Sequence, residues 1–314
     1  MKLTQDLADL TPAPEGAVVS IGVFDGVHRG HRAILDANVE EAQALGAEPT
    51  VVTFQTHPKE LLLGRGPRTL TSLEHRLALF ARAGIRHTVA LPFDDDLRNL
   101  QWERFVEQIC VRGLDARRFV LGFDSKFGRD REGNPELLSS AGYDVRVARK
   151  VEVAGRAISS TAIREAVELG DLPAAMRMLG RPVTVFGTVV EGQQLGRTLG
   201  FPTANLDLHH ELQPPPGVYA CRVRIADEDE AALRPAVANI GVRPTVTGEV
   251  PTTPRLEVHL FDWSGDLYGQ RLEVQFLQRL RSEQRFDGVD ALRAQIARDC
   301  DAARAALANS AAVG

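Results

Sequence analysis

The first half of the chain alternates between short apolar runs and longer segments in which apolar residues recur with helical spacing. Strands are predicted at 17–24, 50–54, 87–93, 118–122 and 143–149. Helices are predicted between and after them, at 31–46, 72–85, 102–113 and 135–142. Alternation of this kind favours a parallel sheet covered on both faces. We therefore expect an α/β domain with a doubly wound parallel sheet, which binds its ligands beyond the carboxyl ends of the strands.

The pattern changes after Arg181 and Pro182, where short strands follow one another with glycine- and proline-rich connections. These runs lie at 184–192, 217–227, 235–241, 255–263 and 271–280. They are typical of an all-β barrel or sandwich, and we predict the barrel. A final amphipathic helix at 289–307 is expected to close the chain. Because 314 residues are too many for one typical compact core, we predict two domains, 1–180 and 183–310.

The composition argues against several classes of protein. With 44% hydrophobic and 25% charged residues, the chain is typical of a soluble globular protein. A net charge of -5 gives no general basic field for nucleic acid, and no apolar stretch is long enough to span a membrane. Three scattered cysteines favour a reducing compartment over disulfides or a zinc site. We expect a cytoplasmic protein with no nucleic-acid or membrane partner and at most weak self-association.

Residues 20–31, SIGVFDGVHRGH, join the first predicted strand to the first predicted helix. A helix N-terminus attracts anions through its unpaired N–H groups and its partial positive charge. Gly26 and Gly30 allow a close approach of backbone and ligand, and His28 and His31 can each donate a hydrogen bond to a phosphate oxygen. The segment predicts a polyphosphate site, with a glycine turn carrying two surface histidines as the alternative.

The stretch GVFDGVHRGH at 22–31 resembles a signature of the nucleotidyltransferase superfamily, whose members transfer a nucleotidyl group from ATP. A second signature of that superfamily is similar to ISSTAIRE at 158–165. The hydroxyls at 159–161 could simply cap the helix that follows. Capping and phosphate binding coexist at one helix start, however, and Arg164 adds a permanently charged fork for phosphate. The two motifs in this order predict a nucleotidyltransferase-like first domain.

The second half opens with EGQQLGRTLGFPTANLDL at 191–208. The stretch does not fit a P-loop, which requires G-x-x-x-x-G-K-[ST], but its glycines could cradle phosphates on backbone N–H groups. Thr203 and Asn205 offer oxygen ligands that Mg²⁺ accepts. Further on, in LEVHLFDW, Glu257 and His259 point to one side of a strand. A lone strand glutamate is usually solvated, so its interpretation depends on the neighbouring motifs.

Taken together, these stretches resemble the prokaryotic bifunctional riboflavin kinase/FAD synthetase family, from residue 22 to about residue 299. GRTLGFPTANL and EVHLFDWSGDLYG carry the likeness to the kinase module. The resemblance implies that the second domain phosphorylates riboflavin with ATP to give FMN. It also implies that Thr203 and Asn205 hold Mg²⁺ and phosphate, and that Glu257 acts as the base toward the hydroxyl.

For the first domain, the resemblance implies an adenylyltransferase that joins FMN to the AMP part of ATP and releases pyrophosphate. His28, His31 and Arg164 are the expected catalytic residues there. The remaining expected nucleotide and flavin contacts of the two domains are Gly22, Phe24, Asp25, Gly26, Gly30, His57, Asp124, Phe127, Ser159, Ser160, Thr161, Gly192, Gly196, Arg197, Gly200, Pro202 and Asn239. For His57, a plain strand-end role is an equal alternative.

The chain departs from the family pattern at three positions. Ser125 stands where the family shows an aromatic residue, although Phe127 remains; Thr56 replaces a proline; and Val246 lies in an altered loop of the second module. These departures bear on flavin affinity more than on the type of reaction. Two alternatives follow: a kinase with a weak or inactive adenylyltransferase, and a flavin-binding regulator without catalysis. A nucleic-acid-binding β module is disfavoured because the chain lacks a basic and aromatic stripe.

Overall fold

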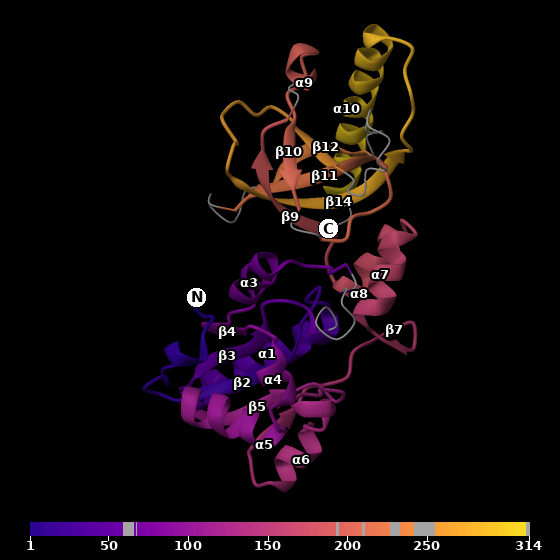
Figure 1. The fold of residues 1–314 in the computed structure, drawn as a ribbon. Helices are drawn as coiled ribbons and strands as arrows, with labels where there is room; N and C mark the ends of the chain where they lie inside the picture. The colour runs from indigo at the N-terminus through magenta and orange to yellow at the C-terminus, as the bar shows by residue number, and fades with distance from the viewer. Residues whose placement is uncertain are drawn as a thin grey trace. The chain divides into compact units, whose positions relative to one another are not determined.

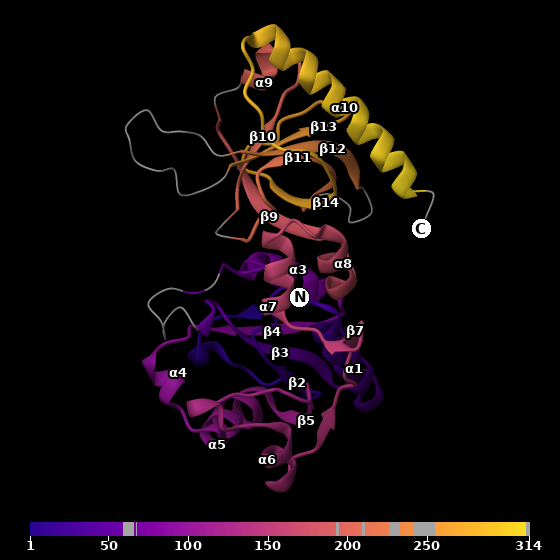
Figure 2. The same cartoon turned by 90° about the vertical axis from the view of Figure 1, so that its right-hand side faces the viewer.

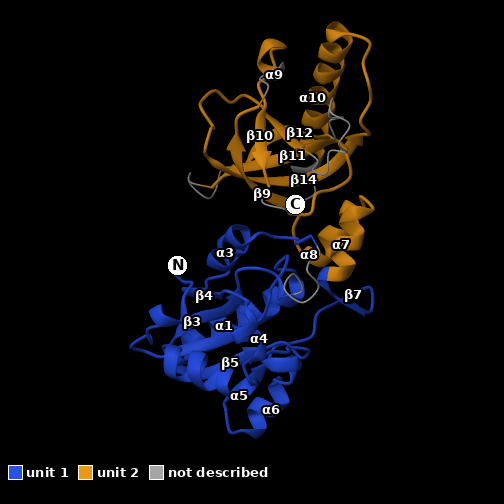
Figure 3. Ribbon diagram, in the orientation of Figure 1, with its two compact units in different colours: residues 1–160 blue, residues 161–314 orange. Residues whose placement is uncertain are grey.

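The computed structural model describes residues 1–58, 66, 68–192, 195–208, 211–226, 233–241 and 255–311. The chain forms two compact units, residues 1–160 and residues 161–314 (Figure 3). Parallel strands and helices build the first unit, whereas antiparallel strands and one long helix dominate the second (Figure 1).

A six-stranded sheet in the order β1-β4-β3-β2-β5-β6 forms the centre of the first unit. Its neighbouring strands all pair in parallel. The strands are β1 (Lys2–Thr4), β2 (Ala17–Ile21), β3 (Glu48–Phe54), β4 (His87–Leu91), β5 (Ala116–Leu121) and β6 (Val145–Val147). The prediction of a parallel sheet is confirmed. The strand β1 was not among the predicted strands, because its three residues give no recognisable apolar run.

Helices cover both faces of this sheet. Val51 and Val52 are neighbours on β3, so their side chains point to opposite faces. Val51 packs in a cluster with Leu35 and Phe80, whereas Val52 packs in another cluster with Phe105. The helical elements of this unit are η1 (Leu7–Asp9), α1 (Arg29–Leu45), α3 (Leu73–Arg82), α4 (Asp95–Asn99), α5 (Trp102–Phe105), the π-helix η2 (Val106–Arg112), η3 (Arg129–Arg131) and α6 (Pro135–Ser140).

The order of the strands reverses at β2, which has β3 on one side and β5 on the other. Ligands of open α/β sheets bind beyond the strand ends at such a switch point. The carboxyl end of β2 leads directly into the turn 22–28 and then into α1. The buried amide of Asn38 on α1 donates to the carbonyl oxygens of Val18 and Thr50, at 3.0 and 3.2 Å, and so fixes α1 on the sheet.

Near its end, the first unit has a hairpin of β7 (Glu152–Val153) and β8 (Arg156–Ala157). The helix α7 (Ser160–Glu168) begins at Ser160, the last residue of the first unit. In the second unit, α7 is followed by α8 (Leu172–Leu179) and by the barrel strands.

The second unit is a closed antiparallel barrel in the order β10-β13-β12-β11-β14-β9, so the predicted barrel is confirmed. Its strands are β9 (Val183–Val190), β10 (Ala204–Asp207), β11 (Gly217–Ile225), β12 (Arg234–Gly241), β13 (Arg255–Leu260) and β14 (Arg271–Arg281). Along β13, Leu256, Val258 and Leu260 are buried and alternate with the half-buried Glu257 and His259. The last two side chains therefore face the outside of the barrel wall.

The long helix α10 (Val289–Ala311) covers one side of this outer wall (Figure 2). Cys300 and Ala303 of α10 are buried against Val218, Ala220 and Val237 of the barrel. The expected closing helix is thus present. A one-turn helix, α9 (Leu195–Thr198), precedes β10 in the same unit.

Candidate active sites

The turn after β2 adopts a backbone that few residue types tolerate. Phe24, Gly26 and Val27 have φ of 53°, 80° and 38°, in the left-handed region where glycine is favoured. Gly26 donates its N–H to Thr71 Oγ1 at 2.9 Å, and a Cβ added there would lie 2.7 Å from Leu70 Cδ1. The turn therefore has little room to change.

The buried side chain of Asp25 stabilises this turn. It is 3% exposed, and its Oδ1 accepts hydrogen bonds from the backbone N–H of Leu70 at 2.9 Å and of Thr71 at 3.1 Å. Its backbone carbonyl accepts from Ser160 Oγ at 3.0 Å. The structure thus joins the first and the second signature within one unit. It gives Asp25, predicted as a ligand contact, a role in shaping the turn.

Arg76 is a residue of this region that sequence reasoning missed. Its guanidinium is buried and donates to the carbonyl of Val23 at 2.7 Å and to that of Phe54 at 2.9 Å, tying the ends of β2 and β3 together. Burial lowers the pKa of Arg76, and the charge of Asp25 opposes that shift. Arg76 lies four positions before the buried Phe80, on the apolar face of α3. A charged residue at such a position was the sequence signal that could have indicated a buried arginine.

His28 caps α1, because its Nδ1 accepts the backbone N–H of His31 at 3.2 Å. A neutral His28 with an accepting Nδ1 carries its proton on Nε2, so the far side of the ring is a hydrogen-bond donor. The His28 and His31 rings stack with centroids 3.6 Å apart, and His31 meets Phe24 edge-on at 5.2 Å. Gly30 and Gly22 leave room, since a Cβ on them would lie 3.1 Å from the rings of His28 and Phe24.

The other predicted residues of the first domain vary in exposure. Ser159 and Asp124 are exposed, and His57 is half-buried just after β3. Thr161 and Arg164 belong to α7 in the second unit, where Thr161 is exposed and Arg164 is half-buried.

The loop after β5 places its aromatic rings differently from the expectation. Phe127 is 4% exposed and packs in the core, whereas Phe123 is 52% exposed with Lys150 Nζ 5.5 Å from its ring centre. Ser125 Oγ accepts the N–H of Gly122 at 2.9 Å and closes the turn. Phe123 is thus the exposed aromatic ring of this loop. It borders a cavity of about 510 Å³ that is lined by Phe123, Lys126, Asn134, Pro135, Glu136, Ser139, Ser140, Val145 and Val147.

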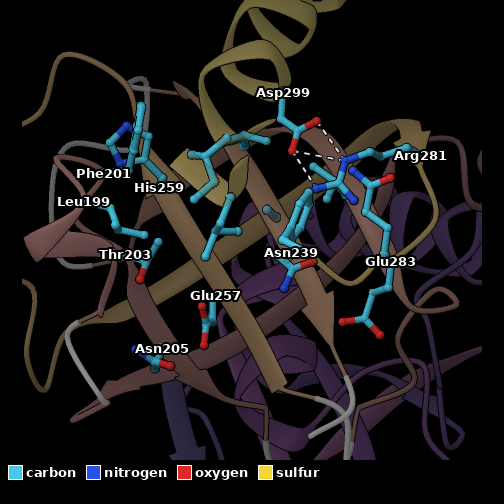
Figure 4. A pocket seen from close by; sticks show the side chains of 18 residues that line it. Leu199, Phe201, Thr203, Asn205, Asn239, Glu257, His259, Arg281, Glu283 and Asp299 are labelled. Atoms are coloured by element: carbon cyan, nitrogen blue, oxygen red, sulfur yellow. Dashed lines mark hydrogen bonds and ion pairs between the residues drawn. The ribbon is translucent and has the colours of Figure 1, made fainter. Parts of the chain in front are cut away.

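The predicted kinase residues meet on the outer wall of the barrel. The strand register pairs Asn205 of β10 with Glu257 of β13, and Glu257 with Asn239 of β12. The three side chains form one row across adjacent strands, and Thr203 lies two residues before Asn205 on the same side. All four line a cavity of about 290 Å³ (Figure 4).

Two glycines of this domain make space for the proposed ligands. A Cβ on Gly192 would lie 2.1 Å from Asn205 Nδ2, and a Cβ on Gly196 would lie 3.1 Å from Thr203 Oγ1. Both glycines were predicted to cradle phosphate. In the structure, Gly192 makes room for the Asn205 side chain, and Gly196 makes room for the Phe201 carbonyl oxygen, 2.4 Å from an added Cβ, as well as for Thr203. Gly200 has a φ of 89°, which fits the turn after α9.

The far wall of the cavity comes from β14 and α10, which sequence reasoning did not assign to the site. Arg281 donates to both carboxylate oxygens of Asp299, at 2.9 Å from Nε and 2.7 Å from Nη2 (Figure 4). Gln295 Nε2 also donates to Asp299 Oδ1, at 2.9 Å. Glu283 also lines the cavity. No local motif links these residues, and only the fold brings them together.

Arg197 in α9 and Pro202 just before β10 are both exposed. Val246, whose departure from the family pattern was noted above, lies outside the described residues. Across the part of the chain that the structure describes, no three His, Cys, Asp or Glu side chains gather as metal ligands. The oxygens of Thr203, Asn205 and Glu257 still suit a hard cation that takes its other ligands from water and substrate phosphates. Among the same described residues, no helix has the length and apolarity to cross a membrane.

Comparisons with known proteins agree with both sites. A family model described as riboflavin kinase matches residues 179–307, and one described as FAD synthetase matches residues 10–162. A bifunctional riboflavin kinase/FMN adenylyltransferase from Pseudomonas fluorescens is 42% identical over 99% of each chain. The chain belongs to this family. The relatives of the same name from Escherichia coli K12 and Bacillus subtilis are 41% and 34% identical, over 95% and 90% of this chain and 96% and 90% of their own.

One solved structure is similar over nearly the whole chain. It has a TM-score of 0.80 and 31% sequence identity, and the match covers 96% of this chain and 98% of that one. Its title names a macrolide-efflux protein from Streptococcus pneumoniae, an activity that belongs to that protein. The resemblance to the riboflavin kinase/FAD synthetase family and the predicted fold class are therefore confirmed.

Proposed function

We propose that this bifunctional riboflavin kinase/FMN adenylyltransferase makes FMN in the barrel cavity and FAD at the turn after β2. The observation that carries the proposal is the row of Asn205, Glu257 and Asn239 beside Thr203 in one cavity. It supports the proposal because it gathers in one cavity a carboxylate, two amides and a hydroxyl, the kinds of group that bind a flavin hydroxyl and a nucleotide phosphate.

In the kinase step, the 5'-hydroxyl oxygen of riboflavin attacks the γ-phosphorus of ATP, and ADP leaves. Glu257 accepts the hydroxyl proton, an effect typically worth ~10²–10⁴-fold. Thr203 and Asn205 would hold Mg²⁺, which neutralises phosphate charge during the transfer. Asn239 orients the flavin from the same row, and Arg197, Pro202 and Gly200 border the nucleotide. Phosphoryl transfer depends mainly on such positioning.

In the second step, a phosphate oxygen of FMN attacks the α-phosphorus of ATP, and the bond to the departing pyrophosphate breaks. The FMN phosphate is already anionic near neutral pH, so no base is needed. His28, through Nε2–H, and His31 stabilise charge on the phosphates. The hydroxyls of Ser159 and Ser160 belong to this phosphate site, and Gly22, Phe24, Gly26 and Gly30 shape it. From the family resemblance, Thr161 and Arg164 of α7 are proposed to bind phosphate as well.

The remaining proposals concern the other contacts and the limits of the domains. We propose domains of 1–180 and 183–310, a cytoplasmic location, and Asp124, His57 and Phe127 in the FMN region. Phe127 would act there indirectly, by packing beneath the loop that exposes Phe123.

The test is a time course of purified protein with riboflavin, ATP and Mg²⁺, with the flavins separated by chromatography. FMN should rise first and then convert to FAD. The variant Glu257→Gln should lose FMN formation by ~10²–10⁴-fold and keep FAD formation from added FMN. Absence of FMN from the wild-type reaction would overturn the kinase proposal.

A second candidate, a kinase with a weak adenylyltransferase, is favoured by one observation. Ser125 replaces an aromatic ring, and its hydroxyl is used to close a turn. Loss of a stacking ring would weaken FMN binding by ~0.5–1.5 kcal/mol. Protein with FMN, ATP and Mg²⁺ discriminates between the two, because full activity releases FAD and pyrophosphate at a rate comparable to that of the kinase step.

A further inference from the structure

His259 links β13 to the segment before β10, and both border the barrel cavity. It lies on β13 two residues after Glu257, so both side chains face the cavity. Its Nδ1 is 2.7 Å from the carbonyl oxygen of Pro202, the residue before Thr203. Because a carbonyl only accepts, Nδ1 carries the proton and donates it. The hydrogen bond thereby joins β13, which carries the proposed base Glu257, to the segment that carries the proposed cation ligand Thr203.

The hydrogen bond from His259 lies just beyond the point where the backbone pairing of β10 with β13 stops. The pairing of β10 with β13 ends at Ala204 opposite Val258, so Thr203 lies just beyond the last paired residue. Pro202 has no N–H, and a proline cannot donate to a strand ladder. The side chain of His259 therefore holds a segment that the main chain of β13 does not pair with.

The ring of His259 is itself fixed on two sides. Phe201 and Phe261 meet it edge-on, each with centroids 5.8 Å away and with interplanar angles of 85° and 73° (Figure 4 shows Phe201 beside His259). Phe201 in turn donates its N–H to the carbonyl of Gly196 at 2.8 Å. These two contacts favour the ring orientation in which Nδ1–H points at the Pro202 carbonyl.

We propose that His259 is a positioning residue for phosphoryl transfer, which holds the Thr203 hydroxyl in register with the Glu257 carboxylate. The proposal rests on the proposed kinase function of this cavity. His259 acts through the backbone of Pro202 and needs no contact with the reacting atoms. The bond adds a side-chain tie to the turn hydrogen bonds within 196–203 and to the first pair of β10.

The test compares two replacements of similar size. In His259→Asn, the amide nitrogen stands close to the place of Nδ1 and can donate to Pro202; in His259→Leu, no donor remains. We expect His259→Leu to raise the KM for ATP and the Mg²⁺ concentration for half-maximal rate by roughly tenfold, the scale of one lost hydrogen bond. The kcat should also fall, and His259→Asn should recover most of these losses.

Two further measurements separate this role from general destabilisation. Hydrogen exchange of the unliganded protein should be faster at 196–203 in His259→Leu than in His259→Asn. FAD formation from added FMN should be unchanged in both, since it uses the other site. Equal kinetics of wild type and His259→Leu, or equal losses in both variants, would refute the positioning role. A wild type that makes no FMN would refute the proposed function itself.

Discussion

The contact between Gly192 and Asn205 predicts a large effect from one added methyl group. In Gly192→Ala, the new Cβ would lie 2.1 Å from Asn205 Nδ2 and 2.5 Å from its Cγ. Contact distances for such atoms are about 3.5 Å, so the carboxamide must move by roughly 1 Å or more. A misplacement of ~1 Å at a positioning group can cost ~10²-fold in rate, which is about 2.7 kcal/mol of transition-state stabilisation.

The assay is riboflavin phosphorylation at varied ATP and Mg²⁺ concentrations. Gly192→Ala should lower kcat/KM by ~10²-fold, and part of the loss should be recovered at high Mg²⁺ because the displaced residue is the proposed cation ligand. Gly288→Ala is the matched control, since its Cβ would meet nothing within 4 Å in the same unit. If Gly192→Ala and Gly288→Ala both kept the wild-type rate, the reasoning from the Asn205 position would be refuted.

Two predictions concern the first unit. In His28→Asn, the side-chain oxygen can still cap α1, but the Nε2 donor is lost. FAD formation from FMN should fall ~10²-fold with FMN formation unchanged, and a parallel loss of both activities would contradict this prediction. For His87, burial lowers the pKa to about 4 from 6.5. The unfolded chain then binds a proton between those pH values and the folded chain does not. Acidification from pH 6.5 to 4 should therefore destabilise the unit by about 2 kcal/mol, less than the full shift because Glu48 lies 3.4 Å from Nδ1. Urea unfolding of wild type and His87→Gln checks this, and an equal pH dependence of both would count against it.

The architecture of both halves could be predicted from the sequence, because it depends on local periodicity. The change from helical spacing to strand runs after Pro182 predicted a parallel sheet in the first part and a barrel in the second, and the structure confirms both. The residues His28, Thr203, Asn205 and Glu257 could be proposed as site residues because their motifs are short and contiguous.

The contacts that shape the sites could not be predicted in this way. Asp25 is engaged by Leu70 and Thr71, which follow it by some forty-five positions, and nothing in its own neighbourhood indicates them. The pair of Arg281 and Asp299 likewise depends on how α10 packs on β14. Steric relations such as that of Gly192 depend on side chains from another strand, which a one-dimensional pattern does not contain.

The closed barrel has a consequence for how the enzyme is made. β9 pairs with β14, so Val183 meets Phe276, and the last cavity wall comes from α10 near the end of the chain. Synthesis must therefore pass α10, which begins at Val289, before the kinase cavity can close, and such long-range closure is slow. The sheet of the first unit, by contrast, has all its strands once residue 147 has emerged. The catalyst for the second reaction is thus assembled before the catalyst for the first.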